Sequence, residues 1–288
     1  MASMGTLAII LLGANFSRRS AMAMLGLLFF PYFWYLAPLL YTDATAVFFA
    51  VAGFALGLRG RNWAAGALFV LGIACRQYIV AFPLAIVAFR YIQARSLRAA
   101  VARETFPLLL SIFSLLIWYR FFGGAGPKVA IDAQAIRAGH IYPNHAVYFL
   151  TTVGVYFVVV EAIIFRSLKA SVSATQCVIA VSVAVLFLLF PPLVNVNTVT
   201  DTMGYLDKAV RLLLPDSMRM IVFLMLAIAT CLRFSPFSLA GLVVYANAAL
   251  MLFAHVAWDK YALPAIAVLW LLSSFGDLRD VRTKHHDA

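Results

Sequence analysis

Two short polar stretches stand between apolar runs in the first third of the chain, and both carry groups that handle protons and phosphates. "LYTDA" contains Asp43, and "CRQY" contains Arg76 and Gln77. A carboxylate such as Asp43 can take a proton from an attacking hydroxyl or hold a cation. A guanidinium such as Arg76 can pair bidentately with a phosphate or with Asp43. The alternative interpretations are an N-cap in a tight hairpin for Asp43 and an anchor to outer lipid head groups for Arg76.

A third polar stretch, "GHIYPNHAVYF", carries imidazole, phenol and amide groups on His140, Tyr142, Asn144 and His145. These groups favour a polar, hydroxyl-rich ligand, and an aromatic belt at a membrane surface is the competing interpretation. His140 and His145 stand five positions apart, unlike a metal-binding pair at i and i+4 of a helix. No metal site is therefore predicted.

A fourth stretch, "AWDKYALP", brings Asp259, Lys260 and Tyr261 to the start of a late apolar run. Lys260 is the second candidate, after Arg76, for a contact with an anionic phosphate. Asp259 and Tyr261 are candidates for substrate binding. The alternative is an interfacial anchor of tryptophan and tyrosine, with the aspartate and the lysine in water.

Composition determines the class of protein that must position these groups. The chain of 288 residues is 65% hydrophobic and only 11% charged, and its mean hydropathy is +0.97. An ordinary soluble domain has about a quarter charged residues, so the sequence predicts a polytopic membrane protein. The net charge of +11 comes from short basic clusters between apolar runs. Such clusters orient a membrane protein and do not indicate a nucleic-acid partner.

Apolar runs bounded by charged or turn residues predict an all-α bundle of about eleven transmembrane segments in one membrane domain, residues 1–288, without a separate soluble domain. The predicted helices lie near residues 5–16, 21–40, 44–58, 63–75, 78–92, 106–122, 147–165, 174–194, 220–232, 237–256 and 261–275.

Alternation of these segments across a membrane sorts the charges. Most of the 22 lysines and arginines fall on one side, which the positive-inside rule makes cytoplasmic, together with the tail 276–288. The opposite side receives Asp43, Arg76 and the two longest loops, 123–146 and 195–219. Any reaction centre is therefore expected at the outer, non-cytoplasmic side. Glu161, the acid most deeply embedded in apolar sequence, is expected to pair with Arg166 at the cytoplasmic boundary.

Other chemistries lack their usual sequence support. The chain contains no G-x-x-x-x-G-K-[ST], G-x-G-x-x-G, G-x-S-x-G or H-E-x-x-H pattern, which disfavours ATP-driven transport, dinucleotide chemistry and common hydrolase designs. Its three cysteines have no paired spacing, so neither a disulfide framework nor a zinc site is predicted.

Taken in order, "LYTDA", "CRQYIVAF", "GHIYPNHAVYF" and "AWDKYALP" resemble the GT-C superfamily of polytopic glycosyltransferases, which use polyprenyl-phosphate sugars as donors. Within it the chain most resembles the α-1,2-glucosyltransferases. In that family a "YTD" stands at the second outer turn, an arginine-glutamine pair follows, and a histidine-aromatic-proline-amide stretch precedes "YF". These features correspond here to Asp43, to Arg76 with Gln77, and to residues 140–149. The late "DKYALP" corresponds to a charged-Tyr-x-x-Pro segment of many relatives.

One departure from the family pattern concerns the N-terminal part. Family members begin with a cytoplasmic N-terminus, a first helix and a large outer loop with an acidic residue thought to be the catalytic base. The first apolar run here, from residue 5, corresponds to their second helix. The expectation is an N-terminally incomplete module, or one whose base is supplied otherwise.

The resemblance implies transfer of a sugar from a polyprenyl-phosphate donor to a lipid or glycan hydroxyl at the non-cytoplasmic membrane face. Arg76, Gln77 and Lys260 would bind the donor phosphate, Asp43 would act as base or orient the base, and a divalent cation is compatible but not required. The alternatives are a transporter or flippase of lipid-linked glycans, or an inactive transferase fragment. Short cytoplasmic loops rich in alanine and arginine favour the bacterial cytoplasmic membrane over the endoplasmic reticulum.

Overall fold

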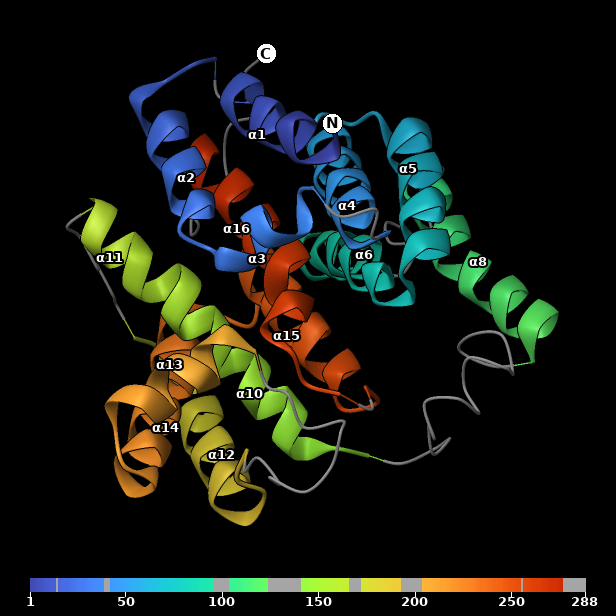
Figure 1. The fold of residues 1–288 in the computed structure, drawn as a ribbon. Coiled ribbons are helices and arrows are strands. Elements are labelled where there is room, and N and C mark those ends of the chain that lie inside the picture. Colours follow the sequence, from blue (N-terminus) through green and yellow to red (C-terminus); the bar gives the residue numbers. More distant parts are fainter. Residues whose placement is uncertain are drawn as a thin grey trace.

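The computed structural model describes residues 1–13, 15–38, 42–95, 104–123, 141–165, 172–192, 204–254 and 256–276. Within these ranges every regular element is helical and no strand occurs (Figure 1). The predicted all-α class is therefore confirmed.

The first half of the chain forms helices that follow one another with short connections. They are α1 (Ala2–Gly13), α2 (Arg18–Leu28), α3 (Pro31–Leu36), α4 (Thr42–Leu58), α5 (Asn62–Cys75), the 3-10 turn η1 (Gln77–Val80), α6 (Ala81–Ala94) and α8 (Phe106–Phe122).

The described residues of the second half form one long composite helix and five further helices. The composite helix runs through α10 (Pro143–Val153), the π-helical stretch η2 (Gly154–Val159) and α11 (Val160–Phe165). The others are α12 (Ala174–Leu189), α13 (Tyr205–Leu213), α14 (Asp216–Arg233), α15 (Leu239–Met251) and α16 (Leu263–Phe275), the last preceded by the 3-10 turn η3 (Asp259–Ala262).

All eleven predicted segments coincide with helix in the described residues, with two differences. The expected helix 21–40 is divided into α2 and α3 because Phe30 precedes Pro31, and a residue before proline avoids helical backbone. The expected outer loop 195–219 contains α13 and the start of α14, so the prediction of a loop is wrong there. The other expected outer loop, 123–146, lies mostly outside the described residues.

Two helices in the described ranges are long and apolar enough to cross a membrane by length and composition. They are Gln77–Ala94, with 18 residues, and Pro143–Phe165, with 23 residues. The remaining apolar helices, including α4, α5 and α8, are shorter.

Helix α16 forms the centre of the bundle, and all its residues from Leu263 to Ser274 are buried. α2 packs along it at Gly26, where a Cβ would overlap the fully buried indole of Trp270. Arg19 at the start of α2 donates to the carbonyls of Ser273 and Gly276 at the end of α16. A cation at that position complements the negative end of the helix dipole.

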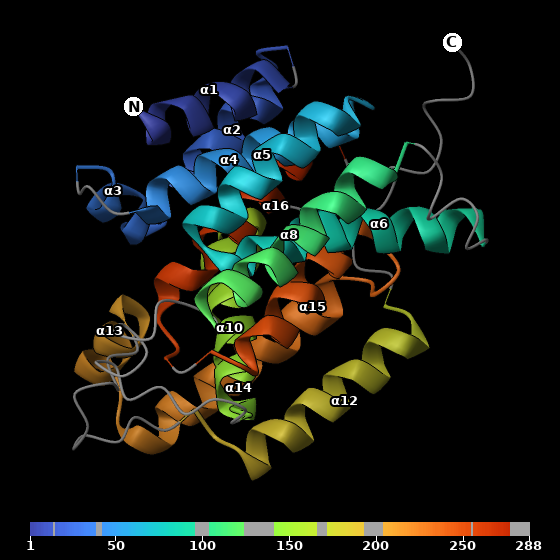
Figure 2. The same cartoon turned by 90° about the vertical axis from the view of Figure 1, so that its right-hand side faces the viewer.

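Two peripheral helices expose apolar faces. α12 leaves Val178, Val181, Val185, Leu188 and Leu189 exposed, and it lies at the edge of the bundle in both views (Figures 1 and 2). α8 exposes Phe113, Leu116, Ile117 and Phe121. Contiguous exposed apolar faces occur where a protein contacts a membrane or another chain.

Candidate functional site

Asp43 and Arg76 form a bidentate ion pair. Asp43 lies in the first turn of α4, and Arg76 lies between α5 and η1 in extended backbone. Arg76 Nε donates to Asp43 Oδ1 at 2.7 Å, and Nη2 donates to Oδ2 at 2.9 Å. The sequence suggested a phosphate or Asp43 as the partner of Arg76, and in the structure Arg76 pairs with Asp43.

The two sides of this pair differ in their access to solvent. The Asp43 side chain is 3% exposed, whereas that of Arg76 is 32% exposed. Tyr78 donates a longer hydrogen bond, 3.3 Å, to Asp43 Oδ1. The carboxylate is thus held from inside the bundle, and the guanidinium is open on its outer face.

Lys260 adds a second positive charge beside this pair. Its Nζ lies 4.0 Å from the centroid of the Trp258 ring and 5.5 Å from that of Tyr261. Burial lowers the pKa of Lys260, while the charge of Asp43 acts to raise it and that of Arg76 to lower it further. Asp43, Arg76 and Lys260 are called the outer charge cluster below. Its net positive charge suits an anion.

Aromatic contacts connect the outer charge cluster to residues 258–261. The rings of Tyr78 and Tyr261 meet edge to face at 5.7 Å, and those of Trp258 and Tyr261 stack at 6.4 Å. Gln77, the other predicted donor-binding residue, opens η1 and is half-buried.

Asp259 lies in a separate, fully buried cage. Its Oδ1 accepts a hydrogen bond of 2.6 Å from the Tyr148 hydroxyl. Its Oδ2 accepts from the Leu206 backbone N–H at 2.8 Å and from the Tyr156 hydroxyl at 3.4 Å. Burial raises the pKa of Asp259 to about 6, although the hydrogen bonds from Tyr148, Leu206 and Tyr156 each oppose this rise.

α13 closes this cage. Gly204 precedes α13 with a φ of 95°, in the left-handed region, and a Cβ there would lie 2.7 Å from Asp259 Cγ. Glycine is therefore required for the chain to pass so close to the carboxylate. Asp207, in the first turn of α13, pairs with Arg211 at 2.6 Å and approaches Arg219 of α14 at 3.7 Å.

The stretch before α10 contacts the end of α15. The Tyr142 backbone N–H donates to the Leu252 carbonyl at 2.7 Å, and His145 Nδ1 lies 2.6 Å from the Ala254 carbonyl. This contact requires a proton on Nδ1, because a carbonyl only accepts. The rings of Tyr142 and His145 stack, with their centroids 4.8 Å apart. Asn144 is half-buried in the same helix start, and His140 lies outside the described residues.

Glu161 pairs with an arginine that the sequence did not suggest. Both Glu161 carboxylate oxygens accept from Arg233 of α14, at 2.7 and 2.8 Å. Arg166 lies outside the described residues. Arg166 was expected because it lies within about one helical turn of Glu161. Arg233 lies 72 positions further along the chain than Glu161, so a local pattern could not indicate it.

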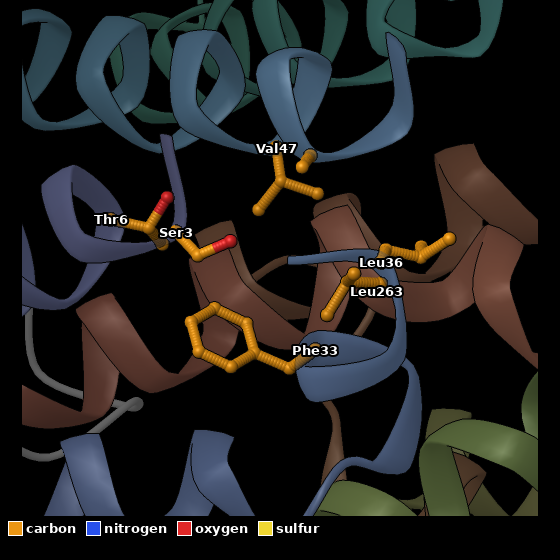
Figure 3. Close-up of a pocket in the computed structure, with 7 residues that line it drawn as sticks. Ser3, Thr6, Phe33, Leu36, Val47 and Leu263 are labelled. Carbon is orange, nitrogen blue, oxygen red and sulfur yellow. The ribbon is translucent and has the colours of Figure 1, made fainter. Parts of the chain in front are cut away.

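A narrow apolar crevice lies beside the first turn of α4. Figure 3 shows Ser3 and Thr6 of α1, Phe33 and Leu36 of α3, Val47 of α4 and Leu263 of α16 around it. The crevice has no room for a water-sized molecule. Among the described residues, no three His, Cys, Asp or Glu side chains lie close enough together to hold a metal ion.

The four polar stretches identified in the sequence thus meet through three side-chain contacts. Asp43 contacts Arg76, Tyr78 contacts Tyr261, and Tyr148 contacts Asp259. Tyr78 and Tyr156 were not selected from the sequence. Tyr148 was noted there among the polar groups of residues 140–149 but was not proposed as a site residue. Comparison of the chain with protein-family models, curated proteins and solved structures finds no match.

Proposed function

We propose that this chain is a membrane glycosyltransferase of the GT-C type. It would move a sugar from a polyprenyl-phosphate donor to a hydroxyl of a lipid or glycan acceptor at the non-cytoplasmic face. The single observation that carries the proposal is the contact between the four polar stretches that give the sequence resemblance, at positions as distant as Asp43 and Asp259. A chance resemblance of short motifs gives no reason for them to meet in space.

The outer charge cluster supplies the electrostatics that this reaction needs. When the bond between the sugar and the phosphate breaks, negative charge develops on the leaving polyprenyl phosphate. Arg76 and Lys260 would stabilise that charge, since preorganised cations contribute most in a site with little water. Asp43 orients Arg76, and the half-buried Gln77 next to it is available for a hydrogen bond to the donor.

The membrane part of the proposal follows from the hydrophobic surface and the helix lengths. A polyprenyl tail is soluble only in a bilayer, so its transferase needs lateral contact with lipid. The two long apolar helices and the exposed faces of α8 and α12 support such a location. The shorter helices would complete the eleven crossings by local thinning of the bilayer or through their flanking residues, with the bacterial cytoplasmic membrane as the favoured location.

The test is a transfer assay with the purified protein in liposomes. Radiolabelled polyprenyl-phosphate hexoses are supplied with lipid-linked acceptors, and covalent label on the acceptor is measured. We expect Arg76→Ala to lower the transfer rate by about 100-fold, as the loss of one charge-stabilising donor does in other sites. Arg59→Ala is the matched control, because Arg59 is exposed near the end of α4 and outside the outer charge cluster.

Two outcomes would contradict the proposal. Label that changes its side of the membrane without covalent transfer would indicate a flippase or transporter of lipid-linked glycans. Equal rates for Arg76→Ala and Arg59→Ala would remove the outer charge cluster from the reaction.

A further inference from the structure

The two outer carboxylates differ in the charge of their hydrogen-bond donors. Asp43 is bound by the Arg76 guanidinium through both oxygens. Asp259 is bound by two phenol hydroxyls and one backbone N–H, all neutral. Both Asp43 oxygens are thus occupied by the Arg76 guanidinium, whereas Asp259 has only neutral donors in a buried site. Burial raises the pKa of Asp259 and makes it a better proton acceptor than an exposed carboxylate.

We propose that Asp259, and not Asp43, is the carboxylate that takes the proton from the attacking acceptor hydroxyl. This inference rests on the proposed transferase function and assigns its base. Asp43 is then a positioning residue that holds Arg76 toward the donor phosphate.

The 3-10 turn η3 places the two required groups side by side. Successive residues of a 3-10 turn point about 120° apart, so Asp259 and Lys260 are directed to different neighbours. Asp259 contacts Tyr148, whereas Lys260 lies over Trp258 and interacts with Asp43 and Arg76. A proton acceptor and a phosphate-binding cation therefore lie on two sides of one turn. The reacting sugar carbon would lie between them.

The Leu206 N–H occupies the place at Asp259 Oδ2 that an acceptor hydroxyl would need. Leu206 N–H donates to Asp259 Oδ2 from the first turn of α13. If this turn moves away about Gly204, a substrate hydroxyl can replace the N–H as donor to the same oxygen. Arrival of the acceptor thus exchanges one hydrogen bond for another and leaves no buried oxygen without a donor.

The step balances without a further reactant. The acceptor oxygen forms a bond to the sugar C1 while the bond from C1 to the phosphate oxygen breaks. The electron pair of that bond leaves with the polyprenyl phosphate, which stays bound to Arg76 and Lys260. The acceptor proton goes to Asp259 Oδ2.

The electrostatic surroundings support this role. Around Asp259 stand the hydroxyls of Tyr148 and Tyr156, the more distant Tyr32, and the Asp207 carboxylate with its arginine partners. With its pKa raised to about 6, Asp259 is ionised at pH 7 and still basic enough for efficient general-base catalysis.

The experiment measures kcat and KM for the donor against pH in liposomes. We expect Asp259→Asn to lower kcat by at least about 100-fold with little change in donor KM, because general-base catalysis contributes at least that much. Asp43→Asn should instead raise the donor KM. Wild-type kcat/KM should fall on the acid side with a midpoint near pH 6, because this ratio reports the pKa of Asp259 in the free enzyme.

Tyr148→Phe provides a test that does not depend on the stability of the Asn variant. Removal of the 2.6 Å hydrogen bond takes away a donor to the ionised carboxylate, so the pKa of Asp259 and the acid limb should move to higher pH. Infrared difference spectra of Asp259→Asn against wild type would show the same carboxyl titration without turnover.

Four outcomes contradict the inference. An active wild type with an unchanged kcat in Asp259→Asn, or an acid limb that does not move in Tyr148→Phe, overturns the assignment of the base alone. Absence of an Asp259 carboxyl titration near pH 6 also overturns it. A wild type that transfers no sugar to any acceptor overturns the proposed function, and the assignment of a base falls with it.

Discussion

The described part of the bundle contains two bidentate carboxylate-guanidinium pairs, which have nearly the same hydrogen-bond geometry and differ in their contact with water. Asp43 and Arg76 meet at 2.7 and 2.9 Å, and Glu161 and Arg233 meet at 2.7 and 2.8 Å. The Arg76 side chain is 32% exposed, whereas that of Arg233 is 11% exposed. The same geometry therefore serves an open pair and a closed pair.

The neighbours of each pair extend this difference. The Arg233 guanidinium lies 5.6 Å from the Phe234 ring, and α12 is attached nearby through Gln176, which donates to the Leu232 carbonyl at 2.7 Å. The Arg76 guanidinium has Lys260 close to it. A buried guanidinium surrounded by packing groups joins two helices, while an open one beside a second cation can bind an added anion.

The largest expected effect is on the closed pair. Arg233→Ala should lower the free energy of unfolding by about 3 to 5 kcal/mol, because it leaves the Glu161 carboxylate buried without a counter-charge. Denaturant unfolding in detergent micelles measures this. The double variant Glu161→Leu with Arg233→Met should recover most of the loss. A loss under about 1 kcal/mol in Arg233→Ala would mean that the closed pair is as weak as a surface salt bridge.

Asp259 sharpens the comparison, because it is a buried carboxylate with neutral donors only. Its pKa is raised from 3.8 to about 6 in the folded protein, so between these values the folded state binds more protons than the unfolded state. Stability should then fall as pH rises from about 4 to 6, by up to about 3 kcal/mol. Melting temperatures of wild type and Asp259→Asn across this range measure the difference, and parallel curves would contradict it.

The open pair should cost less to break. Arg76→Ala should lower the free energy of unfolding by about 1 to 3 kcal/mol, less than Arg233→Ala. Asp43 keeps the Tyr78 hydroxyl and the positive end of α4, and water can enter the space that the guanidinium leaves. The control is Arg59→Ala, for which no change is expected. A greater loss for Arg76→Ala than for Arg233→Ala would reverse the assignment of open and closed pairs.

The smallest expected effect is the stabilisation of the open pair by an anion. Inorganic phosphate at ten times its dissociation constant should stabilise the wild type by about 1.4 kcal/mol. Arg76→Ala should lose this gain, whereas Arg59→Ala should keep it. Thermal shift in detergent at constant ionic strength measures it. An equal shift in Arg76→Ala would indicate that phosphate binds elsewhere.

The sequence predicted the parts of this molecule that depend on local composition. Apolar runs bounded by charged residues located the helical segments. Asp43 was one of the two partners expected for Arg76, the other being a phosphate. The division at Phe30 was not predicted, although its cause, Pro31, stands in the sequence. α13 was missed because Lys208, Asp207 and Arg211 make its sequence look like an outer loop.

The remaining contacts depend on the arrangement of distant helices. Glu161 lies 72 positions from Arg233, and Tyr148 lies 111 positions from Asp259. No pattern within one segment contains such a pairing. The sequence identified Asp259 by its polar character at the start of an apolar run. Only the packing of α10 against η3 shows that its donors are neutral, whereas Asp43 is bound by the guanidinium of Arg76.

The π-helical stretch η2 sets the phase between the two halves of the composite helix 143–165. A π turn accommodates one residue more than an α turn, so Tyr148 before it and Glu161 after it are offset by one position from a continuous α-helix. Deletion of one residue within 154–159 would restore regular winding and rotate the half after this stretch by about 100° relative to the half before it. Tyr148 could then meet Asp259, or Glu161 could meet Arg233, but one straight helix could not make both contacts. The length of this stretch is thus constrained by the two contacts that it connects.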